Sequence, residues 1–224
     1  MLFAFNILHF LCIIAFSSDK LLMVSSTRIL GDLTAAVFVD SLAVMLLALG
    51  SSASLLAMYL LYAVKQKKTI NSLAIPIIGF GMFDAASGFL MSFAWPLPPA
   101  YNMLFGDPLL FLGLLMVMGG YMLYKNMNLK VLSIFGFFLG IYILVEAVAI
   151  LNFKLETGVD LISSMGLYVF SGLSAILSPL VYLDPKSNNG KHAYYLIATL
   201  LIIAAFAALF IGYAAIYAHL LSPP

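Results

Sequence analysis

Six long apolar stretches, separated by short polar connections, dominate the hydropathy of the chain. Each is close to or longer than the ~20 residues that a helix needs to cross the hydrocarbon core of a membrane. The pattern therefore predicts an all-α fold, a polytopic bundle of six transmembrane helices. The predicted spans are residues 36–64, 72–95, 103–124, 129–153, 158–183 and 194–221.

The first residues add a shorter apolar segment. Residues 1–16 are apolar but fall short of the usual spanning length, and residues 17–32 form a polar connection. The segment lacks the positive region and cleavage site of a signal peptide, so we expect it to be retained as a short seventh span or an interfacial helix. Met23 offers an alternative start, which leaves open whether 1–22 belong to the native protein. The predicted division is 1–32, the N-terminal segment with its connection, and 33–224, the six-helix bundle.

Composition and charge agree with a protein whose main partner is the lipid bilayer. Hydrophobic residues make up 64% of the chain and charged residues 8%, which excludes an ordinary soluble domain. The net charge of +1, without a Lys/Arg cluster, argues against a nucleic-acid partner. Cys12 is the single cysteine, and His9, His192 and His219 lie on separate segments. We therefore expect no disulfide, no metal site and no haem or other cofactor.

The lysines predict the orientation of a multi-pass protein of the cell membrane. If the Lys65–Lys68 loop is cytoplasmic, alternation of the helices also places Lys125, Lys130, Lys186 and Lys191 inside. Most carboxylates then lie in the outer half, and the C-terminus is outside. No connection is long enough to hold a soluble catalytic domain, so we expect a protein that acts within the membrane and is not an enzyme.

Residues 76–113 hold the most distinctive pattern. Gly81, Ala85, Gly88 and Ser92 recur at helical spacing, which aligns small side chains on one face and predicts a close contact with another helix. Asp84 lies beside this stripe near the middle of its span. Because a carboxyl is costly in hydrocarbon, Asp84 is expected to face the bundle interior or water.

A proline-rich turn follows this helix. Trp95 suits the membrane interface and Pro96 stiffens the connection. Asp107 followed by Pro108 is typical of a helix N-cap with proline at the first helical position. These residues, with Asn102 and Gly106, are predicted to build a structural turn.

A polar stripe predicts a lining for a solute path. Asp160, Ser164, Ser171, Ser174 and Ser178 fall on one face of the fifth span. The alternative is that these serines bond their own backbone and hold helices together. Asp40, Ser51 and Ser54 form a weaker stripe of the same kind on the first span, with the same alternative.

Two further helices carry groups that could respond to protons. Glu146 lies about two turns from its helix end, with Tyr142 one turn away and able to donate a hydrogen bond. Gly136 and Gly140 form a GxxxG step on another face of the helix, which predicts a helix contact. His219 ends the small-residue face of the last helix, either as a pH-responsive group or as an interfacial residue.

The turn also carries a resemblance. The run Trp95-Pro96-Leu97-Pro98, with Asn102 and Phe105-Gly106-Asp107-Pro108, resembles the signature of an uncharacterised family of archaeal and actinobacterial membrane proteins. The resemblance covers about residues 36–221 and implies a multi-helix integral membrane protein without naming an activity. In helix count and in residues 102–106 the chain also resembles the six-helix acetate and urea channel families. The asparagine-proline motif of the acetate family is replaced by Ala74-Ile75-Pro76.

Three classes of function remain open at this stage. The first is a channel or transporter for a small neutral or protonated solute, with carboxylates in the outer half. The second is an accessory or scaffold subunit of a larger membrane complex. A homo-oligomer would favour the channel, and a discrete set of partner subunits would favour the accessory role. The third is an intramembrane aspartyl protease, because Phe83-Asp84 and Phe105-Gly106-Asp107 resemble the paired aspartates of presenilin-type enzymes. Leu104 replaces the first glycine of that signature.

Overall fold

The computed structural model describes residues 41–66, 68–94 and 96–221. Within these ranges it contains no strand, and six helical segments are long and apolar enough to cross a membrane. The predicted all-α, multi-pass membrane protein is confirmed. The predictions for residues 1–32, Asp40 and Trp95 lie outside the described residues.

The long helices follow the predicted spans closely. They are α2 (Ser41–Val64), α3 (Ala74–Ala94), α5 (Asp107–Tyr124), α6 (Leu132–Phe153), α7 (Gly158–Ile176) and α8 (Asn188–Leu221). Five short helical pieces extend four of them: η1 (Lys68–Leu73), α4 (Pro99–Tyr101), the π-helical η2 (Asn102–Gly106), η3 (Leu129–Val131) and η4 (Ser178–Tyr182).

Two boundaries differ from the prediction. The helix α8 begins at Asn188, before the apolar run predicted from residue 194, because a polar first turn continues the same helix. The span predicted at 158–183 is divided into α7 and η4. Pro179 explains this division, since proline cannot donate the backbone hydrogen bond that an α-helix needs.

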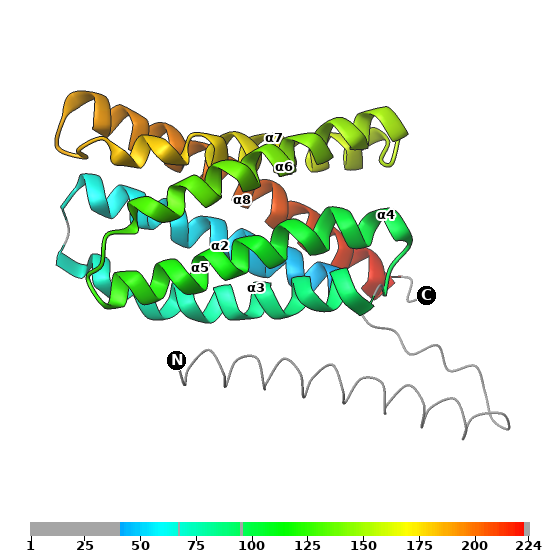
Figure 1. Ribbon diagram of the computed structural model, residues 1–224. Helices are drawn as coiled ribbons and strands as arrows, with labels where there is room; N and C mark the ends of the chain where they lie inside the picture. Colours follow the sequence, from blue (N-terminus) through cyan, green and yellow to red (C-terminus); the bar gives the residue numbers. More distant parts are fainter. Residues whose placement is uncertain (1–40, 67, 95, 222–224) are drawn as a thin grey trace, which may run out of the picture. The chain divides into compact units, whose positions relative to one another are not determined.

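The helices form closely packed pairs. The largest contacts join α3 to α5, α2 to α8, α6 to α7 and α7 to α8, and Figure 1 shows α3 running beside α5. The predicted small-residue face of α3 makes the first of these contacts. A Cβ added to Gly88 would meet the backbone of Gly106 and Leu110, and one added to Gly81 would lie 2.7 Å from the Cβ of Met116. The prediction of a close helix contact is confirmed.

Glycines also permit close backbone contact in two of the other helix pairs. A Cβ added to Gly140 of α6 would lie 2.8 Å from the Gly172 carbonyl oxygen of α7, which confirms the predicted contact at the GxxxG step. A Cβ added to Gly50 of α2 would lie 3.2 Å from the Ala205 carbonyl oxygen of α8. By contrast, α5 and α6 follow one another in sequence but pack much less extensively on each other.

The two ends of the bundle can be told apart by their hydrogen bonds. At the end called here the lysine end, Asn71 donates to Asn126 (2.6 Å), and the Lys130 ammonium donates to the Tyr182 carbonyl (3.1 Å). At the opposite end, called the carboxylate end, the Tyr101 hydroxyl donates to the Leu155 carbonyl (3.4 Å). These bonds join neighbouring connections at each end of the bundle.

Candidate functional site

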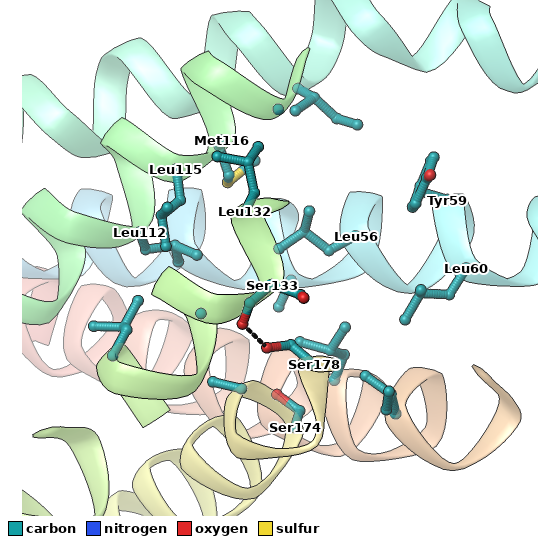
Figure 2. Close-up of a pocket in the computed structure, with 18 of the residues that line it drawn as sticks. Leu56, Tyr59, Leu60, Leu112, Leu115, Met116, Leu132, Ser133, Ser174 and Ser178 are labelled. Atoms are coloured by element: carbon teal, nitrogen blue, oxygen red, sulfur yellow. Dashed lines mark hydrogen bonds between the residues drawn. The ribbon is translucent and has the colours of Figure 1, made fainter. Parts of the chain in front are cut away.

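A large cavity lies inside the bundle, where α5 and α6 diverge. Its volume is about 610 Å³, within the range of ~300–1,000 Å³ typical of small-molecule pockets. Figure 2 shows leucine and methionine side chains of α2, α5 and α6 pointing into it, with serines of α6, α7 and η4 along one side. The walls are mostly apolar and include Leu56, Leu60, Leu112, Leu115, Met116, Leu132, Leu139, Ile143 and Leu201.

The cavity reaches the surface at the lysine end. Asn126, Met127 and Asn128 belong to its lining and are exposed, and Lys130 also lines this region. Polar groups are therefore concentrated at the mouth, whereas the deeper walls are apolar. At the mouth, the side-chain amide of Asn71 donates a hydrogen bond to that of Asn126. This bond links the connection before α3 to the connection after α5.

A tyrosine lies at the other end of the cavity. Tyr168 of α7 is 4% exposed, and its hydroxyl donates to the Leu104 carbonyl at 2.6 Å. The rings of Phe105 and Tyr168 meet edge to face at a centroid distance of 6.2 Å. Both side chains and Leu104 line the cavity, so this contact forms its floor.

The sequence explains why Leu104 needs Tyr168. In an α-helix the Leu104 carbonyl would accept from the residue four positions later, which is Pro108 and has no N–H. The chain forms a π-helical turn over Asn102–Gly106, a geometry common at functional sites. The Tyr168 hydroxyl then supplies the missing donor from another helix. Tyr168 was absent from the predicted site residues, although Pro108 was the signal that a neighbouring carbonyl would need a partner.

Near the cavity floor, hydrogen bonds to the Asp107 carboxylate of α5 connect it to α3 and α6. Its carboxylate accepts from the Ser92 hydroxyl of α3 (2.5 Å) and from the Tyr142 hydroxyl of α6 (3.1 Å). The helix α5 has Gly106 at its N-cap position and no side-chain cap. The prediction of Asp107 as an N-cap is therefore wrong. The π-helical turn continues the helix backward past Asp107, which frees the carboxylate for contacts between helices.

Glu146 lies on the same face as Tyr142, as predicted. It is 7% exposed, and its carboxyl interacts with the Tyr142 hydroxyl. Its Oε2 atom is buried without a hydrogen-bond partner. Ser92, Asp107, Tyr142 and Glu146 thus form one hydrogen-bonded group, called here the Glu146 cluster.

Asp84 belongs to a separate buried site. It is 0% exposed and accepts a 2.5 Å hydrogen bond from Ser52 of α2, while its Oδ1 atom has no partner. The predicted position inside the bundle is confirmed. Ser51 and Ser54 instead donate to carbonyls of their own helix, those of Leu47 and Gly50. Sequence spacing alone gave no reason to prefer Ser52 to its neighbours.

The aspartates of the protease-like pattern have different partners. Asp84 is held by Ser52, whereas Asp107 is held by Ser92 and Tyr142. Ser92 lies eight residues beyond Asp84 on α3, a rise of roughly 12 Å along the helix. The structure therefore does not bring the two carboxyls together as a pair.

The predicted serine stripe lies only partly along the cavity. Ser171, Ser174 and Ser178 line it, whereas Ser164 is buried outside its lining and Asp160 is exposed at the carboxylate end. Ser171 and Ser174 donate to carbonyls of their own helix, at 2.6 Å and 2.7 Å. Ser178 donates to the Ser133 carbonyl at 2.7 Å, the bond drawn in Figure 2. Each hydroxyl proton is thus engaged, whereas each hydroxyl oxygen can still accept a hydrogen bond.

The turn before α5 is built around Asn102. This side chain is 0% exposed, donates to the carbonyls of Leu97 and Pro98, and accepts from the Leu97 N–H at 3.0 Å. Burial and then the nearby Glu156 carboxylate raise the pKa of Tyr101. Pro96 is exposed.

Two other expectations concern histidines and metals. His219 lies near the end of α8 and does not line the cavity. Among the described residues, no group of three or more His, Cys, Asp or Glu side chains could hold a metal ion.

Comparison with known proteins identifies the family. The model of a family described as "Protein of unknown function (DUF981)" matches residues 35–222, so the chain belongs to that family. This confirms the resemblance to an uncharacterised membrane-protein family. No curated protein and no solved structure matches the chain.

Proposed function

We propose that this member of the DUF981 family is a channel or transporter for a small neutral or protonated solute. The observation that supports it best is the cavity itself: it opens at the lysine end, runs between helices, and ends at the Tyr168–Leu104 contact. A cavity that opens at one end of the bundle and ends at a contact between helices is consistent with a transporter in a one-sided state or with a gated channel.

The walls indicate which solutes fit. A charged solute would lose its hydration against leucine and methionine side chains, at a cost of several kcal/mol or more. An uncharged solute with a small polar group would lose less, because hydroxyl oxygens of Ser171, Ser174 and Ser178 lie along the path. The protonated form of a weak organic acid meets both conditions, and it is the solute class that we favour.

The position of the lysines supports an inward-facing mouth. Since positive residues favour the cytoplasmic side of short loops, the lysine end and the cavity mouth are proposed to face the cytoplasm. The test is a single cysteine at Asn188, introduced after Cys12→Ser and probed with an impermeant thiol reagent. Labelling is expected only after the membrane is opened, and labelling in intact cells would reverse the orientation.

Transport is tested by flux into liposomes containing the purified full chain. Acetate, urea and glycerol are compared at neutral and acid pH, with protein-free liposomes as the baseline, because weak acids also cross bare lipid. Flux at that baseline for every solute and pH would remove the transport proposal. A discrete set of co-purifying membrane proteins would then favour the alternative of an accessory subunit.

A matched pair of variants ties flux to the cavity. Leu112 of α5 points into the cavity, whereas Leu114 on the same helix is 43% exposed and lies outside the lining. Leu112→Trp is expected to fill the cavity and reduce flux toward the baseline. Leu114→Trp makes the same change outside the cavity and is expected to retain flux. Equal flux in both variants would show that solute does not use this cavity.

A further inference from the structure

The Glu146 cluster has fewer hydrogen-bond donors than its acceptors require. Tyr142 has one hydroxyl proton, and the geometry directs it to Asp107 at 3.1 Å. Asp107 also accepts from Ser92. Glu146 therefore receives no proton from Tyr142 in this arrangement, although its carboxyl interacts with the same hydroxyl.

An ionised Glu146 would be poorly accommodated in this position. The residue is 7% exposed and its Oε2 atom has no partner. A buried carboxylate without donors is strongly destabilised, whereas a protonated carboxyl can donate to the Tyr142 oxygen. A single extra proton on Glu146 thus completes the chain of hydrogen bonds from Glu146 through Tyr142 to Asp107.

We propose that Glu146 is a proton-binding site, connected through Tyr142 and Asp107 to the solution at the carboxylate end. Asp107 is only partly buried and begins α5, so it can exchange protons with that side. When Asp107 is protonated and Glu146 is ionised, Asp107 donates to the Tyr142 oxygen while Tyr142 passes its own proton to Glu146. One O–H bond breaks and one forms at each transfer, and Tyr142 is neutral before and after.

The surrounding groups set the electrostatic conditions of this site. Facing Glu146 are Asp107 from α5 and Tyr168 from α7, together with Tyr142 on its own helix. Glu156, in the connection after α6, interacts with Tyr168 and Tyr101. These neighbours are acidic or neutral, so their combined field favours the uptake of a positive charge.

A proton fits this site better than a metal cation. Hard cations need about six oxygen ligands, and among the described residues no group of three or more His, Cys, Asp or Glu side chains could hold a metal ion. A proton needs only one acceptor on each side.

The location links the proton to the floor of the cavity. Tyr168 both interacts with Glu146 and closes the cavity through Leu104. Loss of the proton would place a charge beside that contact. The proton site itself does not depend on transport, because it rests on hydrogen bonds and burial alone.

The experiment is infrared difference spectroscopy of the purified full chain in liposomes while the pH is changed. The wild type is expected to show a protonated-carboxyl band that changes with pH. Glu146→Gln, a nearly isosteric change, should abolish this response, and Tyr142→Phe should retain the band at a shifted frequency because its hydrogen bond is lost. Every sample carries Asp84→Asn, because Asp84 is a second buried carboxyl with an unpartnered oxygen and would give a similar band. The wild type in this experiment is therefore the chain with Glu146 and Tyr142 unchanged.

Three results would overturn the proposal. They are a wild type without a pH-dependent carboxyl band, a response that persists in Glu146→Gln, and a band that sodium removes at constant pH. The last result would identify a cation site instead. The spectra measure protonation without any solute, so absence of flux cannot be confused with absence of the proton site.

Discussion

The two faces of α5 show how differently one helix can pack. On one side, α5 meets α3 so closely that their backbones are in contact: a Cβ added to Gly113 of α5 would lie 2.7 Å from the Gly81 carbonyl oxygen of α3. On the other side, α5 faces α6 across a cavity of about 610 Å³. There a Cβ added to Gly119 would have only the Leu132 side chain nearby, at 3.4 Å.

The difference follows from the side chains that each face presents. In a membrane, lipid tails are as apolar as leucine, so helices associate through close packing rather than through burial from water. Small residues on α3 and α5 permit that packing along the whole contact. Leucine, isoleucine and methionine on the other face of α5 and on α6 hold the two backbones apart. The tight pair is the scaffold, and the loosely packed pair leaves room for a ligand.

The largest effect is expected when the tight contact is broken. In Gly88→Leu the new side chain must displace the backbone of Gly106 and Leu110, which cannot shift without separating α3 from α5. We expect a loss of ~3 kcal/mol or more, or failure to fold.

Two control variants introduce the same leucine at glycines outside the tight contact. Gly79 has no atom within 4 Å of an added Cβ, and Gly119 faces the cavity. Gly79→Leu and Gly119→Leu are expected to leave the melting temperature close to that of the wild type, measured by thermal unfolding of detergent-purified protein. Equal melting temperatures for Gly88→Leu and Gly79→Leu would show that the tight contact does not support the fold.

A smaller effect is expected from the buried polar pair that joins α2 to α3. Ser52→Ala leaves both oxygens of the buried Asp84 carboxyl without a donor, at an expected cost of ~1–3 kcal/mol. Asp84→Leu should cost a similar amount, because a branched side chain must fit a site that is 0% exposed.

Asp84→Asn separates shape from charge. Its amide keeps the shape of the carboxyl and can still accept from Ser52, so it should cost less than ~1 kcal/mol. Chemical unfolding of the three variants ranks these effects. If Asp84→Asn is as destabilised as Asp84→Leu, the carboxyl itself, rather than its shape, holds the site together.

The tight contacts were predictable because they depend on local spacing. The stripe of Gly81, Ala85 and Gly88 and the step from Gly136 to Gly140 each lie on a single helix, and each makes the helix contact that spacing implied. Helix ends were also predictable wherever hydropathy changes abruptly, as at Val64, Tyr124 and Phe153.

The site was less predictable because it depends on pairing between helices. Nothing in the spacing of α2 distinguishes Ser52 from Ser51, and only the approach of α3 makes Ser52 the partner of Asp84. Asp107 followed by Pro108 has the local pattern of a cap, but the π-helical turn redirects its carboxylate to Ser92 and Tyr142. A cavity likewise appears only when two helices are placed side by side.

Another small effect on stability is expected at the floor of the cavity. Tyr168→Phe removes the donor that satisfies the Leu104 carbonyl, whose helical partner would be Pro108. The expected cost is ~1 kcal/mol, because one buried hydrogen bond is lost while the ring stays in place. This bond lies at the floor of the cavity, so its loss should let solute pass more readily. Liposome flux should therefore be faster than in the wild type, while the melting temperature should stay within a few degrees of the wild-type value.

Tyr194→Phe provides the matched control for that change. Tyr194 is also buried, and its hydroxyl donates to a backbone carbonyl, that of Val181, at 3.2 Å. It lines the cavity away from the floor formed by Tyr168. Both variants lose one phenolic hydrogen bond, so both should show a similar small loss of stability. Only Tyr168→Phe should raise solute flux. A rise in both variants, or in neither, would show that the Tyr168–Leu104 contact does not limit solute passage. The limiting contact would then lie elsewhere in the bundle.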